Sequence, residues 1–157
     1  MEELKKLISV LTPLTMKKML IKVLKEPEVK RWIIEANQSQ MYEQGIDSEG
    51  KNIGEYTPFT KGVKQSKGQR YDHMTLKDTG DFYKSMLLNI QNDFFDINAD
   101  AKKTDEYGRI IDLLEEYGKE ILGLTEENLK KLENIIIFQM YYIINNELLK
   151  RLGYGIF

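Results

Sequence analysis

The sequence predicts an α+β fold with a helical N-terminal arm, a small antiparallel sheet and a long C-terminal helix. Apolar residues recur at helical spacing through residues 1–44. Two short runs rich in strand-forming residues, 86–90 and 94–99, flank Asn92-Asp93, a pair that is typical of a hairpin turn. A threonine followed by two glutamates introduces a last helix, which we expect to span about 126–152.

The composition is that of a globular protein with its own core. The chain has 157 residues, of which 41% are hydrophobic and 31% charged, and its net charge is −2. We expect a single domain, 1–157, because a chain of this length buries enough surface for one core. The absence of cysteine excludes disulfides, thiol nucleophiles and thiolate metal sites. No apolar run reaches the length of a signal peptide's core or a membrane span, so we expect neither.

The helical arm, 1–44, divides at its prolines. Pro13 and Pro27 each interrupt the apolar spacing, because proline lacks the N–H that an interior helical position donates. We therefore expect two or three helical pieces. Gly45 follows the last piece and is the residue type that most often ends a helix.

Residues 45–80 form a Gly/Lys-rich segment, which we expect to be a long docking loop. Six of the eleven glycines lie here, and the helical spacing of apolar residues disappears. A loop of this length inside a domain is usually functional or mobile. Four basic residues mark it: Lys61, Lys64, Lys67 and Arg70. They predict either a loop that pairs with acids of a neighbouring subunit or, alternatively, a nucleic-acid-binding module that uses the basic stretch 61–70 to contact phosphates.

The remaining segment, 81–157, contains the sheet and the C-terminal helices. A helical turn at 81–84 leads into the first strand. A short amphipathic helix is expected at 109–117 and ends at Gly118. The basic residues near the end of the last helix suit its C-terminus, and Gly153 suits the cap.

The candidate sites for chemistry are weak. The stretch 47–50 has the composition of a calcium loop but lacks the ligands farther along, so a plain turn is favoured. Asp72 and His73, the one histidine, would suit a general base, yet adjacent side chains rarely point together, and an ordinary loop histidine is favoured. A group of acids is read as a solvated face: Asp112, Glu115, Glu116 and Glu120. We expect no catalytic residue, metal or cofactor, although a hydrolase that depends on Asp72 and His73 stays as the weakest alternative.

The run 135–144 is apolar around most of the circumference of a helix. Such a helix requires cover on several sides. Two interpretations stay open: a central core helix, or a helix that packs partly against another subunit. The candidate interface residues are Ile136, Phe138, Tyr141 and Tyr142.

Two motifs in a fixed order resemble a known family. Tyr56, Pro58 and Thr60, then Lys64, precede a Leu-x-x-Thr-Gly-x-hydrophobic-x-x-Ser element, whose places are taken by Leu76, Thr79, Gly80, Phe82 and Ser85. A later element contains Leu122, Gly123 and Leu124 before a terminal helix. This order resembles the virion-morphogenesis, or tail-completion, proteins of tailed bacteriophages over roughly residues 30–145. Two features depart from the pattern: the arginine that usually precedes the Leu-Gly-Leu element is absent, and the C-terminal helix is unusually long.

The resemblance implies a non-enzymatic structural protein of the virion. Such proteins form a ring at the head–tail junction or at the tail end, as a neck, connector or tail-completion component. It implies a homo-oligomeric ring, with other phage neck or tail proteins on the portal, adaptor or tail-tube side as partners and DNA contact in the channel. The expected location is the virion, after assembly in the host cytoplasm.

Overall fold

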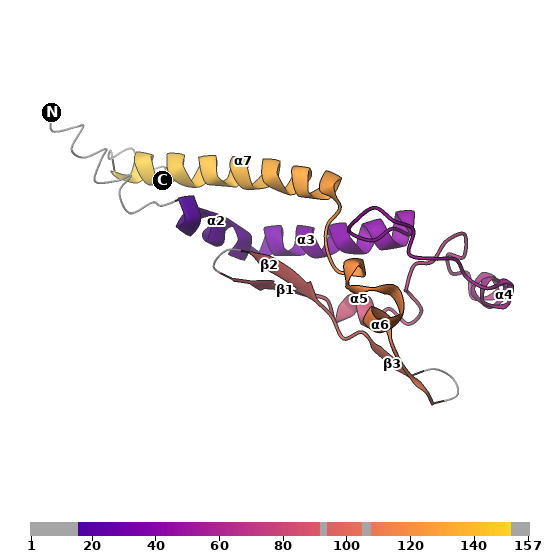
Figure 1. Ribbon diagram of the computed structural model, residues 1–157. Coiled ribbons are helices and arrows are strands. Elements are labelled where there is room, and N and C mark those ends of the chain that lie inside the picture. Colours follow the sequence, from indigo (N-terminus) through magenta and orange to yellow (C-terminus); the bar gives the residue numbers. More distant parts are fainter. Residues whose placement is uncertain (1–15, 92–93, 105–107, 152–157) are drawn as a thin grey trace. The chain divides into compact units, whose positions relative to one another are not determined.

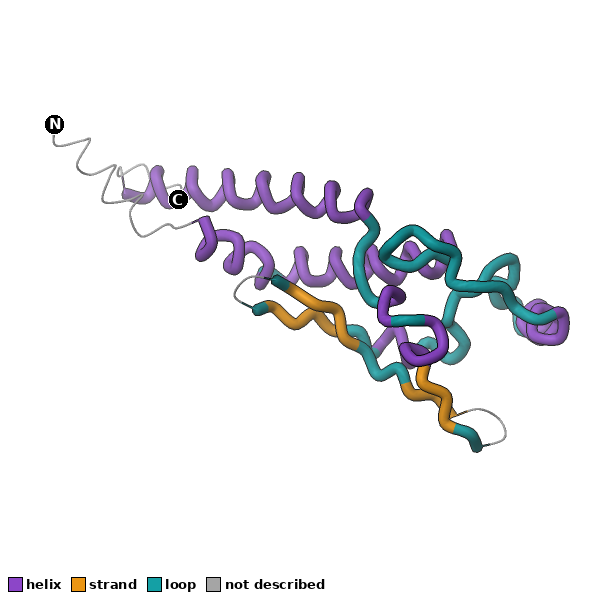
Figure 2. The backbone as a smooth tube through the Cα atoms, viewed as in Figure 1, coloured by secondary structure: helices purple, strands orange, loops and turns teal. Residues whose placement is uncertain are grey.

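The computed structural model describes residues 16–91, 94–104 and 108–151, and it confirms the α+β class (Figure 1). The predicted break at Pro13, the turn residues Asn92-Asp93 and the cap at Gly153 lie outside the described residues. The chain forms two compact units. Unit 1 comprises 1–30 and 130–157, and unit 2 comprises 31–129. The strands of the described residues, drawn in orange in Figure 2, all belong to unit 2. The prediction of a single domain stays a prediction.

Unit 1 is helical where it is described. Helix α2 (Met16–Lys25) ends just before Pro27, which begins α3 (Pro27–Ser39). The predicted break at Pro27 is therefore confirmed. Proline is tolerated at this first helical position because its missing N–H would have no intrahelical partner there. The buried apolar side chains of unit 1 come from these two helices and from the last helix: Met19, Val23, Leu24, Val29, Leu132 and Met140.

Helix α3 continues into a π-helical turn, η1 (Gln40–Gln44), and Gly45 ends it as predicted. Gly45 has φ +66°, and its N–H donates to Met41 O at 3.1 Å. Glycine is required here for a second reason. A Cβ atom at Gly45 would lie 2.6 Å from Cδ2 of His73. The end of the helical arm is therefore fixed against the segment that follows α4.

The segment 45–80 differs from the predicted loop because it contains a helix, α4 (Pro58–Ser66). Thr57 is the N-cap, and its Oγ1 accepts a hydrogen bond from the N–H of Thr60 at 3.2 Å. Pro58 occupies the first turn, where its fixed φ favours a helix start. The sequence contains this start signal, but glycines on both sides and a weak apolar repeat obscured it.

Two antiparallel hairpins follow the short helix α5 (Asp81–Lys84). The first, β1 (Leu87–Ile90) with β2 (Phe95–Asn98), confirms the predicted strand pair, and Leu88 lies opposite Ile97. The second, β3 (Lys102–Thr104) with β4 (Ile110–Asp112), was not predicted.

The predicted helix over 109–117 is wrong in its first half. Ile110 and Ile111 belong to β4, in keeping with the preference of β-branched residues for strands. Asp112 then caps α6 (Leu113–Tyr117), because its Oδ1 accepts from the N–H of Leu114 at 2.9 Å. Gly118 follows α6, as predicted.

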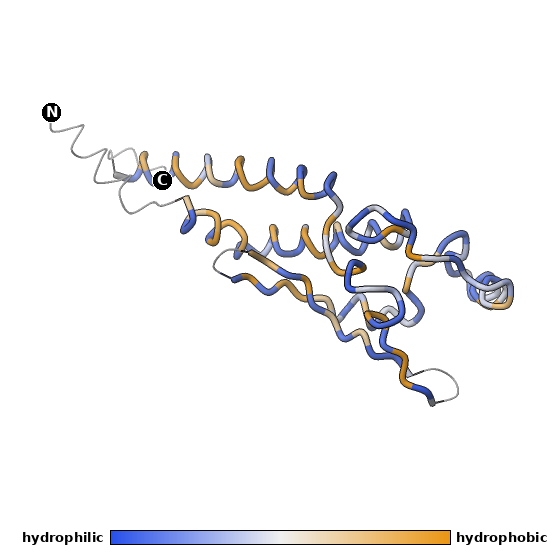
Figure 3. Tube along the Cα trace, viewed as in Figure 1, coloured by the Kyte–Doolittle hydropathy of each residue, from blue (hydrophilic) through white to orange (hydrophobic). Residues whose placement is uncertain are grey.

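A 3₁₀ turn, η2 (Lys119–Ile121), precedes the long helix α7 (Glu126–Arg151). The predicted cap is confirmed, since the N–H of Asn128 donates to Thr125 Oγ1 at 3.3 Å. Hydrophobic and hydrophilic residues alternate along α7 without a consistently polar side (Figure 3).

Candidate functional site

The motif segment 75–85 is a turn whose side chains bind its own backbone. Gly80 has φ +85°, in the left-handed region, and stands at the start of α5. Thr79 Oγ1 donates to Asp81 Oδ2 at 2.6 Å and accepts from the N–H of Asp81 at 3.4 Å. The hydrogen bond from Thr79, together with the nearby Lys84, lowers the pKa of Asp81 below its ordinary value. The polar groups of this turn therefore shape the chain.

The other residues of this motif join the turn to unit 2. Phe82 is buried, as is Leu76, which has φ +52°. Ser85 Oγ donates to Phe82 O at 2.8 Å and accepts from the N–H of Asp100 at 2.9 Å, so it joins α5 to the segment before β3. Tyr83 lies between them in the sequence, and its hydroxyl donates to the carbonyl of Thr75 at 2.6 Å.

The second motif is fixed by a buried glutamine that the sequence did not reveal. Gln40, 1% exposed, donates through Nε2 to Gly123 O at 2.8 Å. Its Oε1 accepts from the N–H of Thr125 at 3.2 Å and from Nδ2 of Asn128 at 3.1 Å. A Cβ at Gly123 would lie 2.9 Å from Cβ of Ser48. Glycine therefore allows this close approach, and Gln40 binds both the glycine and the start of α7.

Asn37 makes a parallel contact one turn earlier in α3. It is fully buried, and its Nδ2 donates to Ile121 O at 3.0 Å. Leu124 is buried, whereas Leu122 is half-buried. A polar pair near the end of an amphipathic helix was the one sequence signal that could have singled out Asn37 and Gln40.

The four basic residues of the predicted docking loop contact acceptors of the chain itself. Lys61 Nζ lies 3.4 Å from Glu55 Oε2, and Lys67 Nζ lies 3.8 Å from Asp78 Oδ1. Arg70 binds Glu43 and also Asp72, at 3.1 Å. Lys64 is buried. Each therefore has an acceptor within the chain, and the nucleic-acid alternative stays a prediction without further support from this arrangement.

Asp72 and His73 do contact one another, contrary to the expectation that adjacent side chains diverge. His73 Nδ1 lies 3.2 Å from Asp72 Oδ2, and its Nε2 lies 2.9 Å from Tyr42 O. Burial acts to raise the pKa of Asp72, but the hydrogen bond from its own N–H and the charges of His73 and Arg70 outweigh it, so the pKa is lowered. The His73 ring also packs against Gly45. Both ring nitrogens are thus occupied by the protein itself, and the ring lies close to Gly45.

The remaining acidic candidates have structural positions. Asp47 Oδ1 accepts from the N–H groups of Glu49 and Lys51, both at 2.9 Å, so the stretch 47–50 is a turn, as favoured from the sequence. Asp112 is the cap of α6. Among the described residues, no group of three or more histidine or acidic side chains is arranged to hold a metal ion.

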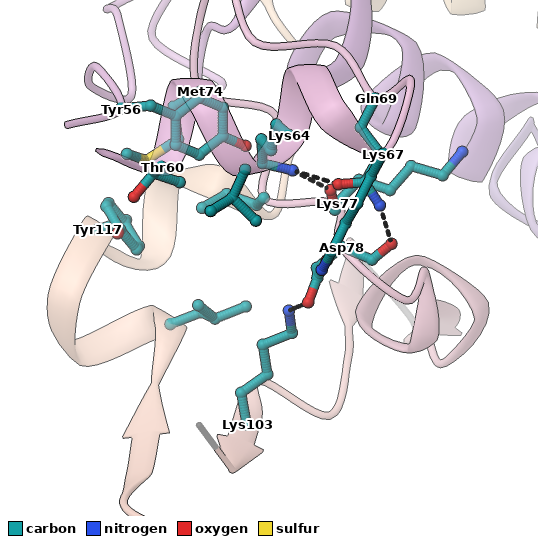
Figure 4. Close-up of a pocket in the computed structure, with 13 residues that line it drawn as sticks. Tyr56, Thr60, Lys64, Lys67, Gln69, Met74, Lys77, Asp78, Lys103 and Tyr117 are labelled. Atoms are coloured by element: carbon teal, nitrogen blue, oxygen red, sulfur yellow. Dashed lines mark hydrogen bonds and ion pairs between the residues drawn. The ribbon is translucent and has the colours of Figure 1, made fainter. Parts of the chain in front are cut away.

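A cavity of about 270 Å³ lies beneath α4 in unit 2 (Figure 4). Residues of α4, of the motif segment, of β3 and of α6 line it. Lys64 projects from α4 into this region, and its Nζ donates to Lys77 O at 2.8 Å and lies 3.3 Å from Gln69 Oε1. Across the cavity, Lys103 approaches Asp78 at 3.8 Å. Of the docking-loop residues, Lys64 and Lys67 line this cavity.

Helix α7 exposes large apolar side chains. The exposed fractions are 59% for Ile137, 68% for Phe138, 66% for Tyr141 and 59% for Tyr142, whereas Ile136 is half-buried. These four exposed side chains lie within two helical turns, at spacings of one, three and four residues, so they share one face. We call this set the α7 apolar face. Three of the four predicted interface residues belong to it.

No protein-family model matches the chain, and comparisons with curated proteins and with solved structures found no significant match. Across the part of the chain that the structure describes, no helix combines the length and hydropathy that a membrane crossing requires.

Proposed function

We propose that the protein is a structural subunit of a tailed-phage particle that assembles into a ring at the head–tail junction. The α7 apolar face is the observation that carries this proposal. Exposed apolar patches of this kind on a folded chain mark interaction sites. The order of the two motifs supports the phage context, because it resembles that of tail-completion proteins.

The motif residues support a structural role in a second way. Thr79, Gly80 and Ser85 shape a turn, and Gly123 allows close packing. The polar atoms of this turn that could do chemistry are engaged by the backbone and by neighbouring side chains. In a ring, identical subunits meet through head-to-tail contacts that close by rotation. The α7 apolar face of one subunit would pack on a different surface of the next.

The test is the molar mass in solution together with the composition of the particle. We expect the wild-type chain to form oligomers by size-exclusion chromatography with light scattering. Replacing both Phe138 and Tyr142 with serine should lower the molar mass to that of a monomer while the helical circular dichroism is retained. The control is Lys150→Ser, an exposed polar position of the same helix that lies away from this face, which should leave the oligomer intact.

Imaging of intact particles tests the location. The protein should occupy a ring at the neck or the tail end. A wild-type chain that is monomeric at all accessible concentrations, or that is missing from particles containing every other neck protein, would contradict the proposal.

A further inference from the structure

The cavity beneath α4 has a wall of ammonium groups. Lys64, Lys67 and Lys103 line it together with one carboxylate, that of Asp78 (Figure 4). Lys77 also lines it, but its Nζ lies 4.7 Å from the ring centroid of Tyr42 and 5.5 Å from that of Tyr83. A contact with a ring does not neutralise a charge, so the four ammonium groups and the one carboxylate leave an excess of three positive charges.

Lys64 is the unusual member of this wall. It is only 6% exposed, although lysine is almost never buried unless it is paired. Its acceptors, the Lys77 carbonyl and the Gln69 amide, are neutral, and its Nζ lies 4.9 Å from the ring centroid of Tyr56. Buried charges are normally paired with an opposite charge. Among the described residues, the contacts of this ammonium include no carboxylate, so an anion is the missing partner.

The other two ammonium groups, those of Lys67 and Lys103, are only loosely neutralised. Asp78 Oδ1 lies 3.8 Å from Lys67 Nζ, and its Oδ2 lies 3.8 Å from Lys103 Nζ. Charge-assisted hydrogen bonds are about 2.7–2.9 Å long, so one carboxylate separates two cations without binding either closely. Both ammonium groups therefore have capacity to bind a further anion.

The rest of the lining is apolar or aromatic. Val63, Met74 and Leu113 contribute aliphatic surface, and Tyr117 contributes a ring. Burial and the charge and hydrogen bond of the neighbouring Glu116 raise the pKa of Tyr117, so its phenol stays protonated. A ligand for this cavity thus needs an anionic group for the lysines and an apolar body for the remaining walls.

We infer that the cavity beneath α4 binds a small-molecule phosphate monoester with an apolar or aromatic body, through Lys64, Lys67 and Lys103. A phosphate monoester carries about −1.5 to −2 charges at neutral pH, which offsets the larger part of this positive excess. Its three terminal oxygens suit three separate ammonium donors. This site is independent of the α7 apolar face and of the proposed ring.

Isothermal titration of the full chain at low ionic strength with phenyl phosphate tests the site. We expect saturable binding that is tighter than that of inorganic phosphate, which lacks the apolar body, and no binding of the neutral analogue benzyl alcohol. Lys64→Met, which keeps the chain length, should weaken binding about tenfold or more, since a charge-assisted hydrogen bond is lost. Lys103→Gln, at a less buried position, should also weaken the binding of phenyl phosphate.

Two further variants separate a binding role from a structural one. Asp78→Asn removes the competing carboxylate, so phenyl phosphate should bind several-fold more tightly. Lys61→Gln, on the same helix but outside the lining, should leave the affinity unchanged. The proposal is overturned if phenyl phosphate gives no saturable heat, if benzyl alcohol binds equally well, or if Asp78→Asn weakens binding. Preferential binding of a DNA fragment over phenyl phosphate would assign the lysines to a polymer phosphate instead and would also overturn it.

Discussion

Gln40 should be among the most sensitive positions of unit 2. Its side chain binds Gly123 O, the N–H of Thr125 and Nδ2 of Asn128. Truncation to alanine leaves two backbone groups without their partner, at a cost of about 1–1.5 kcal/mol each. The cavity left behind adds about 1 kcal/mol. We therefore expect Gln40→Ala to lower the free energy of unfolding by about 3–4 kcal/mol, a large part of the ~5–15 kcal/mol that a domain has.

Urea unfolding followed by circular dichroism measures this loss. With a slope of about 1–3 kcal/mol per molar urea, the midpoint should fall by about 1–4 M. Gln40→Met keeps the volume and removes only the hydrogen bonds, so it should retain the larger part of the loss. Gln44→Ala, an exposed position in the same π-helical turn, should change stability by less than about 0.5 kcal/mol. If Gln40→Ala shifts the midpoint no more than Gln44→Ala does, the three hydrogen bonds do not stabilise the second motif and the reasoning fails.

Two further predictions concern the first motif. Gly80→Ala should destabilise by about 1–2 kcal/mol, because φ +85° is unfavourable for a residue with a Cβ. Its matched control is Gly62→Ala inside α4, where an added Cβ meets nothing within 4 Å, and this change should stabilise the protein by about 0.5–1 kcal/mol. Thermal melts in which Gly62→Ala is the less stable of the two variants would contradict the role of Gly80 in this turn. Burial raises the pKa of Tyr83, so the folded state retains the phenolic proton at pH values where the unfolded chain loses it. The contribution of this phenol to stability is complete below the ordinary tyrosine pKa of about 10 and declines as the pH rises above it. Tyr83→Phe, which also loses the hydrogen bond to Thr75 O, should make this alkaline loss of stability smaller when unfolding is measured across pH. An unchanged pH profile would count against this role of Tyr83.

The elements that the sequence predicted are those with strong local signals. The pair of strands at β1 and β2 has β-forming residues on both sides of a turn, and α7 has a threonine cap and acids in its first turn. Helix α4 has only nine residues and little apolar repeat, so its Thr57 cap did not stand out among glycines. Strand β4 is three residues long and is defined by its pairing with β3 across a hairpin, which an interpretation of Ile110 and Ile111 as helical overlooks.

The functional residues that the sequence predicted are likewise those with a local cause. The motif glycine Gly80 has a local cause, a positive φ in a turn, and a turn is visible in sequence. Gln40 and Asn37 bind residues more than eighty positions away, so their place as a polar pair near the end of a helix is the one local feature that distinguishes them from exposed amides. The burial of Lys64 was equally hidden. A lysine in a Gly-rich basic stretch predicts a solvated side chain, and only the packing of α4 over the motif segment places it in a cavity wall.

The motif and the α7 apolar face should respond to substitution in opposite ways, and this contrast distinguishes folding from assembly. Gly80, Ser85 and Gly123 support the backbone of unit 2, so changing them should lower stability first and weaken association only in proportion to the folded fraction lost. Phe138 and Tyr142 are mostly exposed, so removing them takes little packing from the chain itself. Their loss should reduce association while the unfolding midpoint of the monomer stays near that of the wild type. If these side chains instead stabilised the fold of the subunit, the same substitutions would lower the molar mass and the unfolding midpoint together. Separate measurement of molar mass and unfolding midpoint on the same variants therefore decides whether α7 serves the fold or a neighbouring subunit.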